Sequence, residues 1–416
     1  MKQRLPGLLL VGAVCVTAAF NVKADSLTLA QTLRAAERYS AGLSANQHQA
    51  QALNSRADSA LQLPDPKLKF GVENLPVQGN SAHRFTRDGM TMQTLGIMQE
   101  YVSMEKRQRK SDALHAEAES ILANSEVLRS TLQRDVAQAW LDLCLLSKAR
   151  ETARHLITEA ERQIPAITRS VANGVAGSSV LEARLTLSAM RDQLTDVERD
   201  LTLAQTRLQR LTGETIDTVS GELPRYTRLP AEPDVLAAGV LQHPEVIQAS
   251  REAKVAKARS AQSAIAAIPD VGVEVYYAKR SAGNDDMAGV MVTMDLPLFQ
   301  AKRQNKEYAA DVSQSLEATD RLTLLTRDHL AQLHALVAEY QAAHTRWLRQ
   351  QQEILPLQHQ RLALLLAQYR SGTANLAAVL EARRGVLSSE LDANEAERAL
   401  AQSWAAIRYL TPQDVQ

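Results

Sequence analysis

The chain has 416 residues, and its 47 basic and 47 acidic side chains give a formal net charge of zero. Charges of both signs are interspersed along the sequence rather than gathered into a basic patch, so no nucleic-acid partner is predicted. Only 4% of the residues are aromatic, which argues against ordinary globular domains with bulky cores. The abundance of Ala, Leu, Gln, Arg and Glu is typical of long helices and coiled coils instead.

The first 24 residues have the pattern of an export signal peptide. Lys2 and Arg4 form its positive segment, an apolar run covers Leu8–Phe20, and the residues up to Ala24 suit cleavage. The apolar run is too short to cross a bilayer as a helix. We therefore expect the mature chain to begin at residue 25 and to be exported from the cytoplasm.

The sequence contains two cysteines. Cys15 lies inside the signal peptide, where its neighbours fit a lipoprotein site poorly, so lipidation of Cys15 stays an open question. Cys144 lies between Leu143 and Leu145 and is the one cysteine of the mature chain. It has no partner for an intrachain disulfide, and we expect a buried, unreactive thiol.

The mature chain repeats one order of segments. In each copy a short helical stretch leads to two strands, and a very long helical tract follows. The sequence Leu-Glu-Ala-Arg stands near the far end of both tracts, at 181–184 and 380–383. A period of about 200 residues indicates a duplicated half-domain rather than a solenoid unit. We therefore assign 25–212 to a first repeat, 213–234 to a linker, 235–411 to a second repeat and 412–416 to a tail.

Period-two alternation predicts four strands, over residues 67–77, 89–101, 271–277 and 288–299. The first places Leu68, Phe70 and Val72 on one side and Lys67 and Lys69 on the other. A soluble sheet packed on a helix shows the same pattern. The signal peptide, the polar loops and the strand length of about 9–11 residues favour strands that cross a membrane.

A membrane sheet must pair every backbone N–H and C=O group, so it closes into a barrel. Four strands per chain are too few, because the smallest single-chain barrels have about eight. The predicted fold is therefore mainly α-helical and internally duplicated, and three chains share one membrane β-barrel of twelve strands. Three chains would supply the twelve strands, so we expect a homotrimer in contact with membrane lipid.

Methionines cluster on the second strand of each hairpin. Seven of the nine lie on or beside these strands: Met90, Met92, Met98, Met104, Met287, Met291 and Met294. Thioethers could form a path for a soft cation such as Cu(I) or Ag(I). Flexible apolar filler is the alternative interpretation. The sequence does not decide which face of the sheet carries them.

The tract from Glu105 to about Ile167 contains no glycine and carries a heptad seam with one inserted residue. The seam consists of Leu114, Ala118, Ile121, Ser125, Leu128, Leu132, Val136, Ala139, Leu143 and Leu146. About 60 helical residues span about 90 Å, far more than a compact domain needs. Glycine-containing turns at 169–178 and 369–375 then reverse the chain into helices expected over 180–211 and 376–410.

The second tract repeats this pattern. Its seam consists of Val312, Leu316, Thr319, Leu330, Leu333, Val337, Tyr340, His344 and Trp347. Both seams require partner helices, which predicts coiled-coil packing within the chain or between chains.

Several segments, in this order, resemble the TolC family of trimeric outer-membrane efflux proteins over essentially the whole mature chain. They are His243-Pro244-Glu245-Val246, Leu296-Pro297-Leu298-Phe299, and Tyr369-Arg370-Ser371-Gly372 leading to Leu380-Glu381-Ala382. Pro64-Asp65-Pro66 and the methionine-bearing run from Met90 to Arg107 look most similar to the heavy-metal branch, which includes CzcC and CusC. The CusC type carries a lipidated cysteine, for which this chain has no convincing equivalent.

The resemblance implies a channel in the outer membrane of a Gram-negative bacterium, with a helical tunnel in the periplasm. Its partners would be a periplasmic adaptor (a membrane fusion protein) and an inner-membrane pump of the RND class. It would passively conduct exported heavy-metal cations such as Cu and Ag, or Co, Zn and Cd. Drug efflux and type I protein secretion remain alternatives within the family. A soluble periplasmic coiled-coil adaptor is the alternative from a different class.

The resemblance also implies two groups of functional residues. Glu381 and Glu182 would form carboxylate rings at a channel constriction, where three copies meet. The adaptor-contact tip would consist of Gly174, Tyr369, Arg370, Gly372 and Thr373. A solvated helix face with Arg383 or Arg184 nearby is the alternative for the two glutamates.

No enzymatic motif is present, so no catalytic residue and no cofactor is predicted. The nine histidines are scattered, and His329 and His334 are five residues apart, a poor spacing for chelation on a helix. No metal site is predicted from these spacings.

Overall fold

The computed structural model describes residues 27–172, 178–281 and 283–411. Four sequence predictions fall outside these residues: the signal peptide at 1–24, the state of Cys15, the role of Gly174 and the tail at 412–416. The side chains of residues 164–179 are also outside the description.

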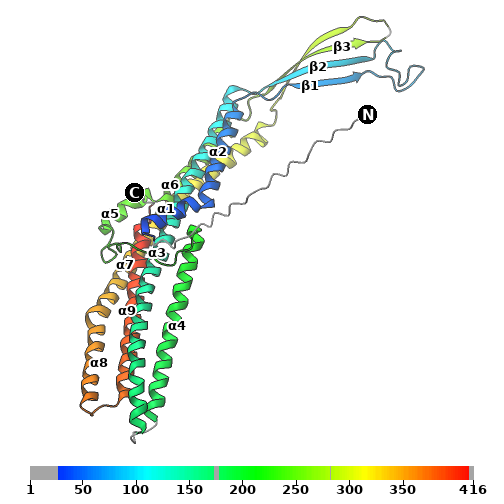
Figure 1. Ribbon diagram of the computed structural model, residues 1–416. Coiled ribbons are helices and arrows are strands. Elements are labelled where there is room, and N and C mark those ends of the chain that lie inside the picture. Colours follow the sequence, from blue (N-terminus) through cyan, green and yellow to red (C-terminus); the bar gives the residue numbers. More distant parts are fainter. Residues whose placement is uncertain (1–26, 173–177, 282, 412–416) are drawn as a thin grey trace, which may run out of the picture.

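Both halves of the chain follow the same order of elements, and the molecule is elongated (Figure 1). The first half comprises α1 (Leu29–Tyr39), α2 (Ala41–Ala60), β1 (Lys67–Glu73), β2 (Met92–Tyr101), α3 (Met104–Ala172) and α4 (Ser178–Thr212). The second comprises α5 (Pro233–Ala238), η1 (Gly239–Gln242), α6 (Pro244–Ser263), β3 (Val271–Arg280), β4 (Met287–Met294), η2 (Gln300–Lys302), α7 (Gln304–Arg349), η3 (Gln350–Ile354), α8 (Leu355–Arg370) and α9 (Leu376–Arg408). The sheet lies at one end of the molecule, and the last residues of α3 and α8 lie at the other (Figure 1).

Helix α3 has 69 residues and is therefore about 100 Å long. It continues past Pro165 to Ala172, a few residues beyond the predicted end. None of the ten predicted seam residues is exposed, and Val136, Ala139 and Leu143 are completely buried. The seam therefore faces partner helices, as the heptad pattern predicted.

The second long helical tract is interrupted, which the sequence analysis did not predict. A single π-helical turn, η3, separates α7 from α8, and the Leu355 N–H bonds to the Gln350 carbonyl. Pro356 follows at the start of α8. Because proline lacks an N–H and crowds the carbonyl of the preceding turn, the helix accommodates it by widening locally.

The main core lies in the middle of the helical part, around Trp140 of α3 and Trp404 of α9. The indole N–H of Trp140 donates to the Leu27 carbonyl at 3.0 Å and so fixes the start of the described chain to α3. The segment between the halves crosses this core, where Ile216 and Tyr226 are buried. Ile216 and Tyr226 therefore hold the segment at 213–232 against the helices at two points.

The four strands form one antiparallel sheet in the order β1-β2-β3-β4. Their ends differ from the predicted ones. β1 stops at Glu73 rather than residue 77, because Asn74 adopts a left-handed φ of 55° and Pro76 lacks a pairing N–H. β4 stops at Met294 rather than residue 299, shortly before Pro297, whereas β3 extends to Arg280.

None of the described helices combines the length and the apolar composition needed to cross a membrane.

Cys144 is half-buried rather than fully buried, and burial is the main cause that raises the pKa of its thiol. A raised pKa keeps the thiol protonated, which agrees with the expected low reactivity.

Candidate functional site

The sheet has one strongly apolar face. The strand register places ten apolar side chains on it: Leu68, Phe70, Val72, Leu95, Ile97, Val273, Val275, Tyr277, Val290 and Val292. All ten are exposed, and Phe70 reaches 83%. Burying this surface in an apolar environment would be strongly favourable.

The opposite face of the sheet is polar. Lys67 bonds to Glu100 at 3.2 Å, and Lys69 reaches across β2 to Glu274 of β3 at 2.5 Å. The second bridge passes Gly96, where a Cβ atom would lie 3.3 Å from a Glu274 carboxylate oxygen. The missing side chain at Gly96 therefore leaves room for an ion pair between non-adjacent strands.

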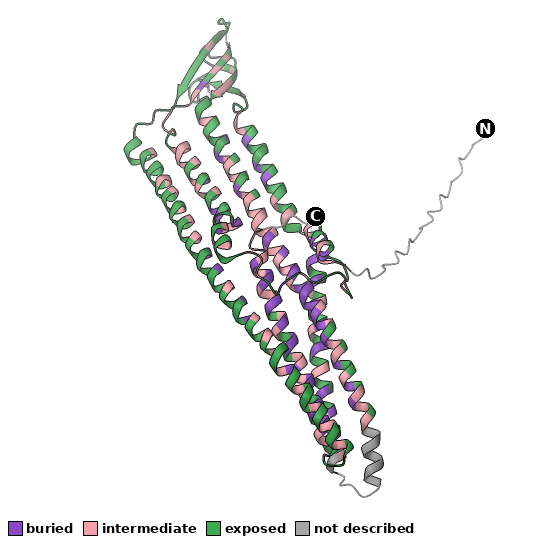
Figure 2. Cartoon of the chain, turned by 90° about the vertical axis from the view of Figure 1, so that its left-hand side faces the viewer, coloured by how far each residue is buried: buried purple, intermediate pink, exposed green. Residues whose placement is uncertain are grey.

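The sheet extends beyond the ends of the helices, and both of its faces are largely open (Figures 1 and 2). No helix covers the apolar face among the residues that the structure describes. Within the described residues, the sheet is therefore not packed on a helix, as a soluble sheet would be. The outer edges of β1 and β4 also have no partner strand within the described residues.

The register decides the facing of the methionines, which the sequence left open. Met92, Met98, Met287 and Met291 lie on the polar face, whereas Met294 lies on the apolar face. Met98 and Met291 are the direct cross-strand partners of Glu274, one on each side. Thioethers and a carboxylate thus share one row across the polar face.

The second helical tip is built by a glycine turn. Gly372 follows α8 with a φ of 78°, and its N–H donates to the Tyr369 carbonyl at 3.1 Å. The Thr373 N–H donates to the Gln368 carbonyl at 2.9 Å, which completes a Schellman motif. Asn375 then caps α9 by accepting from the Ala378 N–H at 2.9 Å.

Four of the five predicted tip residues lie together in this turn. Arg370, Gly372 and Thr373 are exposed, and Tyr369 is half-buried against the cluster that includes Leu376 and Leu380. The fifth, Gly174, lies outside the described residues. The end of α3 and the start of α4 lie at the same end of the molecule as the end of α8 and the start of α9 (Figure 1).

The two predicted constriction residues have different surroundings. Glu381 is exposed and forms a two-pronged ion pair with Arg384, with its shortest contact at 2.6 Å. Glu182 is exposed near the start of α4. The sequence analysis named Arg383 as the neighbour of Glu381, and this was wrong, because Arg383 lies on the buried side of α9 and pairs with Glu159 of α3.

The structure brings together a third group that the sequence analysis missed. His243, Glu245 and His329 lie close enough for one ligand atom of each to bind a common ion. The sequence contains a signal for half of it, because His243 and Glu245 flank a proline at a helix start. His329 lies far along the chain, so only the packing of α6 on α7 could reveal the third member.

Comparison with known proteins agrees with this architecture. No family model and no curated protein matches the sequence. One similar crystal structure is that of CusC, which concerns conformational changes that accompany folding and transmembrane channel formation. Its chain is 15% identical in sequence, with a TM-score of 0.75 over 93% of this chain and 92% of that one. The outer membrane protein VceC from Vibrio cholerae is 19% identical, with a TM-score of 0.72 over 92% and 95% of the two chains. The Neisseria gonorrhoeae MtrE outer membrane channel, in its open state, is 14% identical, with a TM-score of 0.74 over 95% and 93%.

The chain has the fold of these outer-membrane channels. The likeness covers nearly the full length of each pair, so it includes the sheet, the long helices and the tips. It confirms the fold that the resemblance to the TolC family implied, a mainly helical chain with four strands.

Proposed function

We propose that three copies of this chain form a passive outer-membrane efflux channel without enzymatic activity. The observation that carries the proposal is the four-stranded sheet, with one exposed apolar face, one polar face and two open edges. In lipid, open edges leave backbone N–H and C=O groups unpaired, which costs several kcal/mol for each group. Closure with other copies removes that cost.

The strand count supports three copies. Three sheets of four strands give twelve strands, within the range of outer-membrane barrels, and β1 of one copy would pair with β4 of the next. The apolar face would then contact lipid, and the polar face with Lys69 and Glu274 would line the lumen. β2 and β3, with 10 residues each, match the length that an oblique crossing requires.

Exposed leucines on the helices support association below the sheet as well. They form pairs on one face of a helix: Leu181 and Leu185 on α4, Leu316 and Leu324 on α7, and Leu357 and Leu364 on α8. Leu316 belongs to the second predicted seam, in which Leu316, Thr319 and Leu330 are exposed whereas Leu333 and Tyr340 are buried against other helices of the chain. Neighbouring copies would cover these leucines and enclose a tunnel about 100 Å long.

The tip would contact a periplasmic adaptor that recruits an inner-membrane RND pump. The Gly372 turn, with Arg370 and Thr373 exposed beside it, offers a rigid, polar end for such a contact.

Threefold symmetry would also bring three copies of Glu381, and three of Glu182, near the axis. Because Arg384 already pairs with Glu381, a Glu381 ring would be nearly neutral, and Glu182 would supply more of the negative charge.

Heavy-metal cations are the proposed substrates. The thioethers of Met98 and Met291 on the polar face would line the lumen and suit soft cations such as Cu(I) and Ag(I), while Glu274 between them pairs with Lys69. Drug efflux and type I secretion use the same architecture and remain the alternatives. A soluble coiled-coil adaptor is disfavoured, because the exposed apolar face would have no cover in water.

Two measurements test the proposal. The first is fractionation followed by native mass spectrometry in detergent, and we expect trimers in the outer-membrane fraction. Monomers, or protein that stays in the soluble fraction, would contradict the channel. The second is growth of a deletion strain on graded Cu, Ag, Zn, Co and Cd and on several antibiotics. Sensitivity to metals alone supports the metal assignment, and sensitivity to antibiotics alone replaces it with drug efflux.

A further inference from the structure

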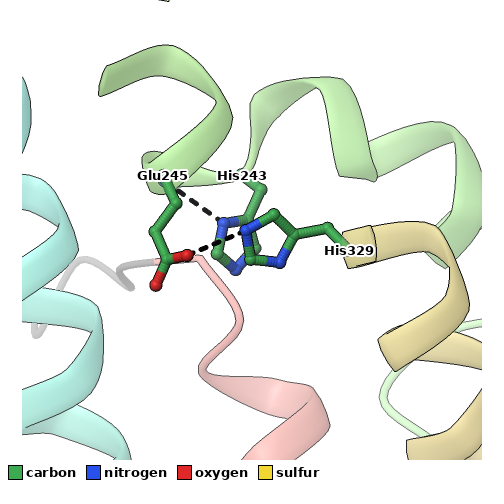
Figure 3. A group of neighbouring side chains, drawn as sticks. All are labelled: His243, Glu245 and His329. Carbon is green, nitrogen blue, oxygen red and sulfur yellow. Dashed lines mark hydrogen bonds and ion pairs between the residues drawn. The ribbon is translucent and has the colours of Figure 1, made fainter. Parts of the chain in front are cut away.

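Two buried histidine rings join α6 to α7. His243 caps the start of α6, and His329 lies within α7. Their ring centroids are 3.9 Å apart, their planes differ by 28°, and their residues are only 8% and 7% exposed. Figure 3 shows the two rings stacked beside the side chain of Glu245.

The ring nitrogens of this pair are poorly satisfied. Nδ1 of His243 accepts the Glu245 N–H at 3.2 Å, at the upper end of the usual range. Nε2 of His329 lies 2.9 Å from a Glu245 carboxylate oxygen, but neither nitrogen of His329 has a hydrogen bond of acceptable geometry to a described residue. Buried polar groups almost always have a partner, so the geometry leaves room for one that is not part of the chain.

The surroundings of His243 suit a cation as that partner. Burial, and next to it the adjacent His329, lower the pKa of His243 to about 4, although Glu245 opposes the shift. Near neutral pH the His243 imidazole is therefore uncharged and keeps a nitrogen lone pair for coordination. Glu245 is half exposed and adds a carboxylate oxygen.

We propose that His243, Glu245 and His329 bind one divalent transition-metal ion, such as Zn²⁺. The ligands would be Nε2 of His329, a carboxylate oxygen of Glu245 and Nδ1 of His243, whose single lone pair would exchange the Glu245 N–H for the ion (Figure 3). One ligand atom from each residue lies within 4.8 Å of the others. Bonds of about 2.0–2.1 Å in a tetrahedral site separate ligand atoms by about 3.4 Å, so small side-chain rotations close the site.

The donor set also indicates the class of metal. Two imidazoles and one carboxylate suit zinc, copper or nickel, whereas magnesium and calcium prefer oxygen ligands alone. Water would take the fourth position, since only three protein ligands converge. The bound ion would fasten the start of α6 to α7 and stabilise the folded chain by mass action. This role is independent of the channel proposal, because it needs neither a barrel nor an exported substrate.

Direct metal binding tests the inference. The full processed protein, purified in detergent without a histidine tag and stripped with a chelator, is dialysed against Zn²⁺ and assayed by mass spectrometry of the metal. We expect one Zn²⁺ per chain. Co²⁺ should give the visible absorption of a site with nitrogen and oxygen ligands.

Three variants make the test specific. His243→Asn keeps a helix-capping side chain but removes a strong metal ligand. His329→Ala removes the second imidazole. His334→Ala is the matched control, because His334 is an exposed histidine on the same helix. Loss of an outer-shell partner already weakens metal sites by about 10–100-fold, so each ligand variant should raise the Kd for Zn²⁺ at least about tenfold.

Two outcomes would overturn the inference: absence of stoichiometric binding to the wild-type chain, or equal Zn²⁺ affinities in His329→Ala and His334→Ala. Thermal unfolding gives a second readout, because Zn²⁺ should raise the Tm of the wild type and of His334→Ala but not of His243→Asn. Circular dichroism of each metal-free variant establishes that the helices are intact before Zn²⁺ is added.

Discussion

Arg383 on α9 donates a hydrogen bond to the carboxylate of Glu159 on α3, and so joins the last helix of the chain to the first long one. The Arg383 side chain is only 8% exposed. The hydrogen bond from Arg383 is the main cause that holds the pKa of Glu159 below its ordinary value. Because Arg383 is buried, removal of the Glu159 carboxylate would leave the Arg383 guanidinium without a counter-ion.

We therefore expect Glu159→Gln to weaken the contact between α3 and α9 by about 1–3 kcal/mol. Glu198→Gln is the matched control, since Glu198 pairs with Arg154 at 2.6 Å where both side chains are exposed, and such pairs contribute about 0–1 kcal/mol. Hydrogen exchange of the two helices measures the difference. Equal exchange rates in the two variants would show that the Arg383 pair adds no stability.

Opposite changes at Glu381 and Arg384 test the proposed constriction. Glu381→Gln leaves the positive charge of Arg384 without its partner, and we expect lower cation selectivity in a planar bilayer. Arg384→Gln frees the carboxylate, and we expect higher cation selectivity. Identical selectivity in both variants, with the trimer intact, would place this pair away from the conduction path.

Substitutions at Gly372 separate backbone conformation from adaptor contact. Gly372 has a φ of 78°, yet a Cβ atom there meets no other atom within 4 Å, so only the left-handed backbone restricts the position. Asn tolerates this conformation, whereas a β-branched residue costs about 1–2 kcal/mol or more. We expect Gly372→Asn to keep the turn and Gly372→Val to distort it.

Metal resistance and trimer yield of the two Gly372 variants give the answer. If metal resistance survives in Gly372→Asn and is lost in Gly372→Val, the glycine is needed for the backbone conformation of the turn. Loss of resistance in both variants, with normal trimers, assigns the surface of the turn to a partner. Loss of the trimer in Gly372→Val would instead make the turn a requirement for folding.

A pair of substitutions on neighbouring strand positions tests which face of the sheet contacts lipid. Phe70→Lys places a charge on the apolar face, where lipid contact near the bilayer centre costs about 2–4 kcal/mol. Lys69→Gln changes the opposite face and should have little effect on insertion. The measurement is the fraction of each variant recovered as a trimer in the outer membrane. Equal recovery would contradict the assigned facing.

The stability of the metal-free chain should depend on pH through His243. Its pKa in the folded chain, about 4, lies below its ordinary value of 6.5, so folding favours the uncharged ring. This contribution is complete above pH 6.5 and decreases as the pH falls from 6.5 to about 4. In the presence of a chelator, the Tm of His243→Asn should fall less than that of the wild type between pH 6.5 and about 4. The Tm of His334→Ala should fall as much as that of the wild type. An unchanged slope in His243→Asn would assign the pH dependence to other groups.

The predictions from sequence succeeded where a local pattern has one structural solution. The heptad seam of α3 predicted its buried face, since apolar residues at alternating steps of three and four must face partner helices. Gly372 marked the end of α8, because few other residues adopt its φ. The exact strand ends were wrong near Pro76 and Pro297, where the loss of an N–H donor ended pairing earlier than the alternation suggested.

Contacts between distant segments could not be predicted in this way. The facing of Met98 depends on its register with Lys67 and Glu274, and a shift by one residue would reverse it. The alternative interpretation of Glu381 expected Arg383 nearby, whereas helix geometry turns that side chain toward Glu159 on another helix. His329 could be matched with His243 only after α6 had been packed on α7.

By itself, the sequence determined the kinds of segment in this protein, their order and its repetition, because helical and strand periodicities depend on neighbouring residues alone. The tertiary structure decided which faces remain open, which charges are paired and which histidines meet. Those outcomes depend on how helices and strands from different parts of the chain pack together, and a local pattern contains no record of that packing.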